Sequence, residues 1–351
     1  MTAQSLPDVW KIPVRLGLAG FGRMARSYYV PALRELTEAC VTGVVDPLTT
    51  SLEAARATYP GIATSAHLES LLEQGIDALI VASPPSTHVA LWLRAAAKGI
   101  PVFLEKPAGL REQLATAAPN PRERSLLMVD FTRRFWPPYQ RMRELVRQGV
   151  LGQLTGLDIQ LHVNVKPWCS VTSHRLQPGE GGVLFDLGSQ AVDLACWITG
   201  LPPREIFASS TSLRWEHDHV LVRLLFADGL QARCNIAYAD RGVERVRVIG
   251  RAGELWVSNP NMALHYRRCG QTTFPGWTAA LDLMVLGYRG LRRSRSMLRY
   301  SVTAALKTFL KSLRAGVPFS PGFPEAEANA RLLDAAADAL ECGSTLTGYS
   351  A

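Results

Sequence analysis

The pattern of hydrophobic and polar positions divides the chain into two parts with different periods. In the first part, short apolar runs at residues 14–18, 78–82 and 101–104 have the length and composition of strands. Between them lie stretches suited to helices, at residues 52–58, 68–74 and 89–98. Strands that alternate with helices at this spacing predict an α/β fold with a doubly wound parallel sheet.

From about residue 153 the pattern changes to the alternation typical of strands. Six segments are rich in Val, Ile, Leu and Thr, at residues 153–165, 205–214, 219–226, 230–238, 243–249 and 253–258. Turn signals at 227–229 and 251–253 predict hairpins, which indicates a large, mostly antiparallel open sheet. Helices are expected at 183–198 and at 325–341, and the second could pack back onto the first part of the chain.

A glycine turn follows the first expected strand. Residues 20–25 read G-x-G-x-x-A between a strand and a helix, which is a dinucleotide-binding fingerprint. Gly20 would make the tight turn, and Gly22 would let the backbone approach a pyrophosphate. Arg23 and Met24 open a helix whose free N–H groups would face the phosphate charge. The first domain is therefore predicted to be a Rossmann domain.

An acidic residue, Asp46, stands at the end of the second expected strand, 24 residues beyond Gly22. A carboxylate at this place can accept hydrogen bonds from the adenosine ribose hydroxyls and would repel a 2′-phosphate. The pattern therefore predicts NAD as the cofactor in preference to NADP. The alternative is that Asp46 is only a turn residue before Pro47.

Composition narrows the class of protein. The 351 residues suffice for two domains, and we expect a dinucleotide-binding domain at 1–133 and an α+β domain at 134–351. No apolar run approaches the roughly 20 residues that cross a bilayer, and six scattered cysteines suit a reducing cytoplasm, with no metal site. The net charge of +8 favours acidic ligands, but dispersed basic residues do not indicate nucleic-acid binding.

Four separated segments together resemble the family of glucose–fructose oxidoreductase, inositol dehydrogenase and the rhizopine-catabolism protein MocA. The first is the glycine turn, and the second runs from Ser83-Pro84-Pro85-Ser86-Thr87-His88 to Glu105-Lys106-Pro107. The third is Arg133-Arg134-Phe135 with Gly149 and Gly152-Gln153-Leu154. The fourth runs from Gly181 to Gln190 and is followed by Asp193. The resemblance implies an NAD(P)-dependent oxidoreductase that acts on sugars, cyclitols or related polyols.

The resemblance also implies roles for particular residues. It places Lys106 beside the nicotinamide and the reacting hydroxyl, and it places Asp186 at the substrate. It assigns to the cofactor loops Ser83, Pro84, His88 and Glu105. It further makes the open face of the second sheet a contact between subunits, so we expect a homo-oligomer.

The sequence departs from the family at Gln190, where a histidine that exchanges the proton is common. Gln190 can hold a substrate oxygen but cannot titrate. Lys106 is then the best remaining acid–base group, and the second candidate is His174. The loop that contains His174 also contains Trp168 for stacking and Arg175 for an anionic group.

Asp186, Gln190 and Asp193 are spaced by four and three residues, so a regular helix would present them on one face. The basic run 288–295 is either a solvated helix or a contact with a phosphorylated or nucleotide-linked sugar, a lipid headgroup or another subunit.

Three functions remain open from the sequence. The first is hydride transfer to or from a sugar or cyclic polyol derivative, with glutamine in place of the usual histidine. The second is a redox-neutral epimerisation or elimination that uses a tightly bound NAD. The third is a non-catalytic, nucleotide-binding sensor or scaffold.

Overall fold

A computed structural model describes residues 13–164, 180–212, 217–269 and 297–342. The chain forms two compact units. The first contains residues 1–109, 113–130 and 302–326, and the second contains residues 110–112, 131–301 and 327–351. In the described residues, no helix is long and apolar enough to cross a membrane.

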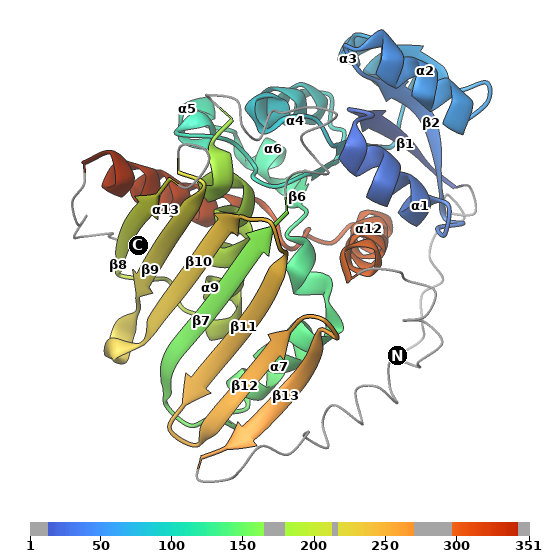
Figure 1. The fold of residues 1–351 in the computed structure, drawn as a ribbon. Coiled ribbons are helices and arrows are strands. Elements are labelled where there is room, and N and C mark those ends of the chain that lie inside the picture. The colour runs from blue at the N-terminus through green and yellow to red at the C-terminus, as the bar shows by residue number, and fades with distance from the viewer. Residues whose placement is uncertain (1–12, 165–179, 213–216, 270–296, 343–351) are drawn as a thin grey trace. The chain divides into compact units, whose positions relative to one another are not determined.

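The first unit is built on a six-stranded sheet in which every neighbouring pair is parallel (Figure 1). Its spatial order is β3-β2-β1-β4-β5-β6. The strands are β1 (Val14–Ala19), β2 (Ala39–Val45), β3 (Ala63–Ser65), β4 (Ala78–Val81), β5 (Val102–Leu104) and β6 (Leu127–Val129). The order reverses between β1 and β4, as in doubly wound dinucleotide-binding folds, so the predicted fold class is confirmed.

Helices pack against this sheet, and three of its strands are apolar throughout. Every residue of β4, β5 and β6 is buried, which requires packing on both faces. The helices of this unit are α1 (Val30–Leu33), α2 (Thr49–Thr58), α3 (Leu68–Glu73), α4 (His88–Ala97), α5 (Gln113–Ala117), α6 (Pro121–Ser125) and the part of α12 (Met297–Ala315) from Val302 onward. Phe309 of α12 packs edge-on against Phe103 of β5, with ring centroids 5.5 Å apart.

The second unit is built on a seven-stranded sheet of order β13-β12-β11-β7-β10-β9-β8. The strands are β7 (Leu154–Val163), β8 (Glu205–Thr211), β9 (His219–Leu225), β10 (Gln231–Tyr238), β11 (Val243–Gly250), β12 (Gly253–Ser258) and β13 (Ala263–Arg268). Only β7 and β10 pair in parallel, so the sheet is mostly antiparallel as predicted. The edge strand β13 was not predicted, because Leu264 is its one fully buried residue and its apolar pattern is weak.

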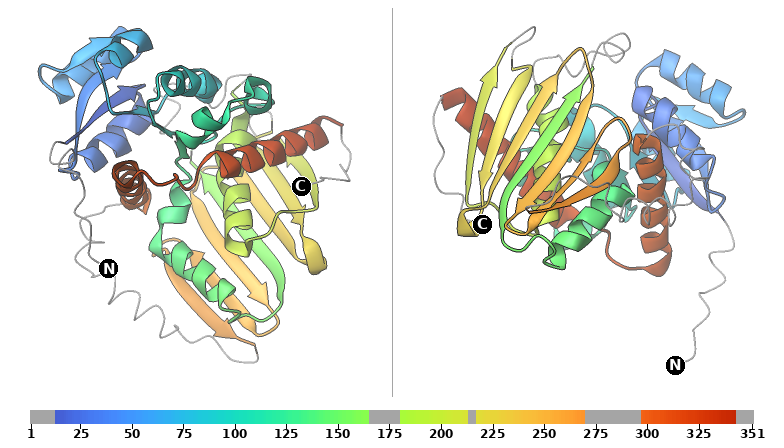
Figure 2. Two further views of the ribbon diagram at one scale, coloured as in Figure 1. Left: turned by 180° about the vertical axis from the view of Figure 1, so that it is seen from behind. Right: turned by 60° about the horizontal axis from the view of Figure 1, so that its bottom comes forward.

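One face of the second sheet is apolar and covered by helices. Leu157, Ile159 and Leu161 of β7 alternate into the core. The covering helices are α7 (Pro137–Arg147), α9 (Ser189–Thr199) and the part of α13 (Phe323–Cys342) from Glu327 onward (Figure 2, left). The opposite face carries no helix among the described residues (Figure 1).

The C-terminal segment that packs onto the first unit is not the one expected from the sequence, which was the helix at 325–341. The segment that returns to the first unit is 302–326, and α13 from Glu327 onward belongs to the second unit. Leu333 lies against Gly188, and the Asn329 side chain donates to the carbonyl of Ser189 at 2.9 Å. The alanine and leucine residues of α13 therefore complete the second core.

The two glycines of the turn after β1 lie in different surroundings. Gly20 has φ +91°, and a Cβ there would lie 2.7 Å from the carbonyl oxygen of Ala82. A Cβ at Gly22 would meet nothing within 4 Å apart from its own chain neighbours. The fold therefore requires glycine at position 20 but not at position 22.

Replacing Gly20 with alanine should lower the free energy of unfolding by about 1–3 kcal/mol, because the residue would be strained and would clash with Ala82. Gly22→Ala should change it by only about 0.5 kcal/mol or less. Urea unfolding of the two variants tests this contrast, and equal destabilisation by both substitutions would contradict it.

Candidate active site

The carboxyl ends of the strands of the first sheet bring the predicted cofactor residues to one edge. The Gly20 N–H donates to the carbonyl of Val45 at 2.8 Å, which joins the glycine turn to the end of β2. Asp46 strengthens the same junction, because its Oδ2 accepts the Phe21 N–H at 2.8 Å and its Oδ1 accepts the Leu48 N–H at 2.9 Å. Asp46 is thus a structural part of the turn as well as a candidate ribose ligand.

The residues of this edge fit a dinucleotide. The space next to Gly22 is open, and a side chain at this position would occupy it. The fold does not require glycine there, so the open space is available to a ligand. The Asp46 carboxylate uses two acceptor positions on backbone N–H groups, and a carboxylate has about four. Gly22, Arg23 and Met24 would therefore hold a pyrophosphate, and Asp46 would accept from ribose hydroxyls.

His88 joins the loop after β4 to the loop after β5. Its side chain is buried, with Nδ1 2.7 Å from the Pro107 carbonyl oxygen and Nε2 2.9 Å from the Ser83 carbonyl oxygen. Both ring nitrogens therefore face main-chain carbonyl oxygens, and a neutral ring donates its one N–H to one of them. This arrangement fixes Ser83 and Pro84 relative to Lys106, and it leaves the His88 ring no nitrogen for proton exchange with a substrate.

Glu105 and Lys106 follow β5 and rest on a buried polar cluster. Glu105 Oε2 accepts the backbone N–H of Lys106 at 3.1 Å, and Glu105 Oε1 lies 2.8 Å from the hydroxyl of Tyr29. The same hydroxyl lies 2.8 Å from Oδ2 of Asp130, which follows β6. Burial and then the Glu105 charge raise the pKa of Asp130 well above its ordinary value.

Sequence reasoning missed Tyr29 and Asp130. Tyr29 is 76 residues from Glu105 and 101 residues from Asp130 along the chain, and neither Tyr29 nor Asp130 lies in a recognisable motif. Tyr29 ends a π-helical turn, Ala25–Tyr29, that directly follows the glycine turn. Such turns are rare and often occur at functional sites, but their position is not visible in a hydrophobic pattern.

Asp186 belongs to the second unit and lies in another π-helical turn, Leu184–Gly188, that precedes α9. Its side chain is partly exposed, and its Oδ2 accepts the hydroxyl of Tyr238 at 3.2 Å. The charge of Asp186 also acts on the nearby guanidinium of Arg133. A partly exposed carboxylate with fixed neighbours is suited to accept hydrogen bonds from substrate hydroxyls.

Gln190 does not lie on a common helix face with Asp186, as a regular helix would have placed it. Its side chain is buried, and Nε2 donates to Thr132 Oγ1 at 3.2 Å. Its Oε1 is buried and has no hydrogen-bond partner. Because the π-helical turn interrupts the helix between Asp186 and Gln190, four-residue spacing does not give the alignment of a regular α-helix.

Asp193 is held in an ion pair, which corrects the expectation that it extends the Asp186 face. The Arg134 guanidinium donates to both its oxygens, at 2.9 and 2.6 Å. A parallel pair joins Arg133 to Glu244 at 3.0 and 2.8 Å. Burial alone would lower the pKa of Arg133, but Glu244 outweighs this effect and raises it. Asp193 is therefore occupied by a structural partner.

Three predicted substrate residues, Trp168, His174 and Arg175, lie outside the described residues, as does the basic run 288–295. The described candidate residues form two sets. The first unit carries the glycine turn, Asp46, the two loops that His88 joins, and Lys106; the second carries Asp186 and Gln190.

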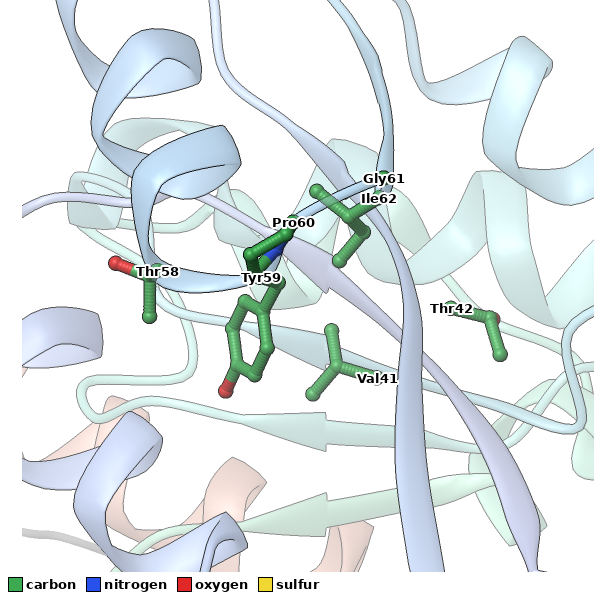
Figure 3. Close-up of a pocket in the computed structure, with 7 residues that line it drawn as sticks. All are labelled: Val41, Thr42, Thr58, Tyr59, Pro60, Gly61 and Ile62. Atoms are coloured by element: carbon green, nitrogen blue, oxygen red, sulfur yellow. The ribbon is translucent and has the colours of Figure 1, made fainter.

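An open pocket of about 460 Å³ lies elsewhere on the first unit (Figure 3). It is lined by Val41, Thr42, Thr58, Tyr59, Pro60, Gly61 and Ile62. Val41 and Thr42 lie in the first half of β2, whereas the candidate cofactor residue Asp46 follows the carboxyl end of that strand. This pocket contains none of the candidate residues and is not the proposed site.

Two family models match the chain. Residues 14–120 match the oxidoreductase family with an NAD-binding Rossmann fold, and residues 139–256 match the GFO/IDH/MocA C-terminal domain. The rhizopine catabolism protein MocA of Rhizobium meliloti is 31% identical over 192 residues, which cover 54% of this chain and 58% of that protein. The alignment thus spans little more than half of this relative. An inositol 2-dehydrogenase of the same species is 27% identical over 258 residues, covering 70% and 76%.

Solved structures share the whole fold. The WlbA dehydrogenase of Bordetella pertussis, crystallised with NADH and UDP-GlcNAcA, has a TM-score of 0.81 at 19% identity and covers 97% of this chain and 99% of its own. A myo-inositol dehydrogenase of Corynebacterium glutamicum has a TM-score of 0.76 at 21% identity, covering 97% and 100%. This chain belongs to the oxidoreductase family of glucose–fructose oxidoreductase, inositol dehydrogenase and MocA, and its first unit contains the NAD-binding Rossmann domain of that family.

Proposed function

We propose that this protein is a cytoplasmic NAD(P)-dependent oxidoreductase that transfers hydride to or from a sugar or cyclic polyol derivative. The observation that carries the proposal is the Glu105-Lys106-Pro107 segment, which follows β5 at the same sheet edge as the glycine turn and Asp46. Family membership supports it. NAD, when bound, would supply or accept the hydride.

Lys106 is the residue we assign to the reacting oxygen. As hydride leaves the carbinol carbon of an alcohol, the hydroxyl proton needs an acceptor, and the reverse reaction needs a donor. Lys106 would exchange this proton or hold the oxygen that carries it. Asp186 would accept hydrogen bonds from hydroxyls of the substrate, and Gln190 would help to position them without exchanging a proton.

The substrate class and assembly state follow as finer proposals. The basic charge of the chain favours substrates that carry an acidic group, so phosphorylated and nucleotide-linked sugars belong in the substrate screen beside inositols. We also propose a homo-oligomer, because the face of the second sheet opposite its helices carries no helix among the described residues.

Two aromatic rings stack at the outer strands of this sheet. They are those of Trp256 in β12 and His265 in β13, with ring centroids 5.2 Å apart.

A redox-neutral reaction is the second candidate, because Gln190 cannot titrate and its amide is buried. An epimerase or lyase would return the hydride to its substrate in each cycle. Net formation of NADH during turnover separates the two reactions. A nucleotide sensor, the third possibility, would bind NAD but turn over none of the screened sugars.

The cofactor prediction concerns Asp46. NAD should bind more tightly than NADP, because the Asp46 carboxylate would pair with the ribose diol and repel the 2′-phosphate. Asp46→Ala should narrow the gap between the two dissociation constants in calorimetry. The ratio of the two dissociation constants is the quantity to compare. Loss of the hydrogen bond between Asp46 and Phe21 would loosen the glycine turn and weaken the binding of both cofactors. Comparable binding of both by the wild type would contradict the prediction.

The Lys106 prediction concerns rate. Lys106→Met should lower turnover by roughly 10²–10⁴-fold, the usual scale of general acid–base catalysis, while NAD affinity stays nearly unchanged. Steady-state kinetics on a substrate found in the screen measures the rate, and calorimetry measures the affinity. Turnover within a few-fold of the wild type would remove Lys106 from the mechanism.

The Gln190 prediction separates positioning from proton transfer. Gln190→Ala should weaken substrate binding by about tenfold at most, because a neutral hydrogen bond contributes about 0.5–1.5 kcal/mol net. Loss of turnover at unchanged substrate affinity would instead place Gln190 in the transition state. If Gln190→His creates a dehydrogenase activity that the wild type lacks, the redox-neutral or non-catalytic function is favoured. Both variants need intact folding and NAD affinity.

A further inference from the structure

A buried cluster of one tyrosine and two carboxyl side chains adjoins the backbone of Lys106. The Tyr29 hydroxyl is 2.8 Å from Glu105 Oε1 and 2.8 Å from Asp130 Oδ2. Tyr29 and Asp130 have no exposed surface, and Glu105 is 7% exposed. The three residues come from the π-helical turn Ala25–Tyr29, the end of β5 and the end of β6, so the fold of the first unit fixes their approach.

The number of protons in this cluster is constrained by its geometry. A phenol has one proton and can donate it to only one of two carboxylates. If both carboxyls were ionised, the second would face the Tyr29 oxygen without a proton between them. A second proton is therefore needed, and it has to lie on one of the carboxyl groups.

Asp130 is the better holder of that proton. Its Oδ1 is buried without a hydrogen-bond partner, so an ionised Asp130 would be almost unsolvated. Glu105 is better placed to stay ionised, because its Oε2 also accepts the Lys106 N–H at 3.1 Å. The charged groups that act on Asp130 are Glu105, which favours the neutral acid, and Lys106, which opposes it.

We propose that Asp130 is a neutral acid at pH 7 that donates to Tyr29, that Tyr29 donates to Glu105, and that this chain holds Glu105 as the carboxylate that positions Lys106. Tyr29 and Asp130 are then positioning residues, and neither touches substrate. Only the role of Lys106 in turnover rests on the proposed function. The protonation state of the cluster does not.

Two substitutions test the direction of the hydrogen bonds. Asp130→Asn supplies an N–H donor in place of the acid O–H and cannot ionise, so it should preserve the chain. Asp130→Ala removes the donor, and Tyr29→Phe removes the bridge. Tyr59→Phe is a matched control in the same unit, because the Tyr59 hydroxyl is buried and has no partner.

Carbon-13 NMR of protein labelled at the aspartate side-chain carboxyl reads the protonation state without any substrate. The Asp130 resonance is identified by its loss in Asp130→Asn. It should have the shift of a neutral acid at pH 7, in the wild type and in Tyr59→Phe. A carboxylate shift at pH 7 would overturn the proposal.

The pH dependence of the unfolding constant gives a second test of the Asp130 protonation state. Burial and Glu105 raise the pKa of folded Asp130, so its stabilising effect is complete below the unfolded value of about 3.9 and is lost as pH rises toward the folded value. The unfolding constant of the wild type, relative to that of Asp130→Asn, should therefore rise about tenfold per pH unit over this window. A ratio that does not change with pH would contradict the proposal.

Turnover tests the effect on Lys106. Asp130→Asn should keep kcat within a few-fold of the wild type, whereas Asp130→Ala and Tyr29→Phe should lower it by about ten- to a hundredfold with KM and NAD affinity unchanged. Equal losses in Asp130→Asn and Asp130→Ala would show that an N–H donor at this position does not preserve the chain and would overturn the proposal. If the wild type turns over no screened sugar, the proposed function fails, and the NMR and stability measurements decide the protonation state.

Discussion

Strands of the first sheet all run in one direction, and this constraint decides where the candidate cofactor residues lie. Parallel strands end on the same edge, so the residues that follow β1, β2, β4 and β5 meet there although they are far apart in sequence. Direct hydrogen bonds then fix the loops relative to one another. Asp46 holds the glycine turn, and His88 holds the loops of Ser83 and Pro107.

Two ion pairs among the described residues of the second unit are largely buried. Arg134 with Asp193 and Arg133 with Glu244 have two hydrogen bonds each, and all four side chains are at most 15% exposed. Such pairs are weak evidence for stability, because removing the charges from water costs about as much as the pairing returns. Their effect here is geometric: they fix the segment before α7 against α9 and β11.

Both π-helical turns stand beside candidate site residues. One follows the glycine turn and places Tyr29 between two carboxyl groups, and the other contains Asp186. A π-helical turn adds a residue to a helix and so changes the direction of the side chains that follow. Asp186 lies in this turn and contacts Tyr238, whereas Gln190 and Asp193 lie in α9 and contact Thr132 and Arg134.

The sequence by itself determined the kinds of the two sheets and most of their strands, the glycine turn and the places of Asp46 and Lys106 at strand ends. These follow from local signals, because strand and helix periods and the need for φ above zero at Gly20 act over a few residues. Only the tertiary structure decided the partners of these residues. The approach of Tyr29 to Glu105 and Asp130, and the pairing of Asp193 with Arg134, join residues 59 to 101 positions apart through buried contacts that no local pattern encodes.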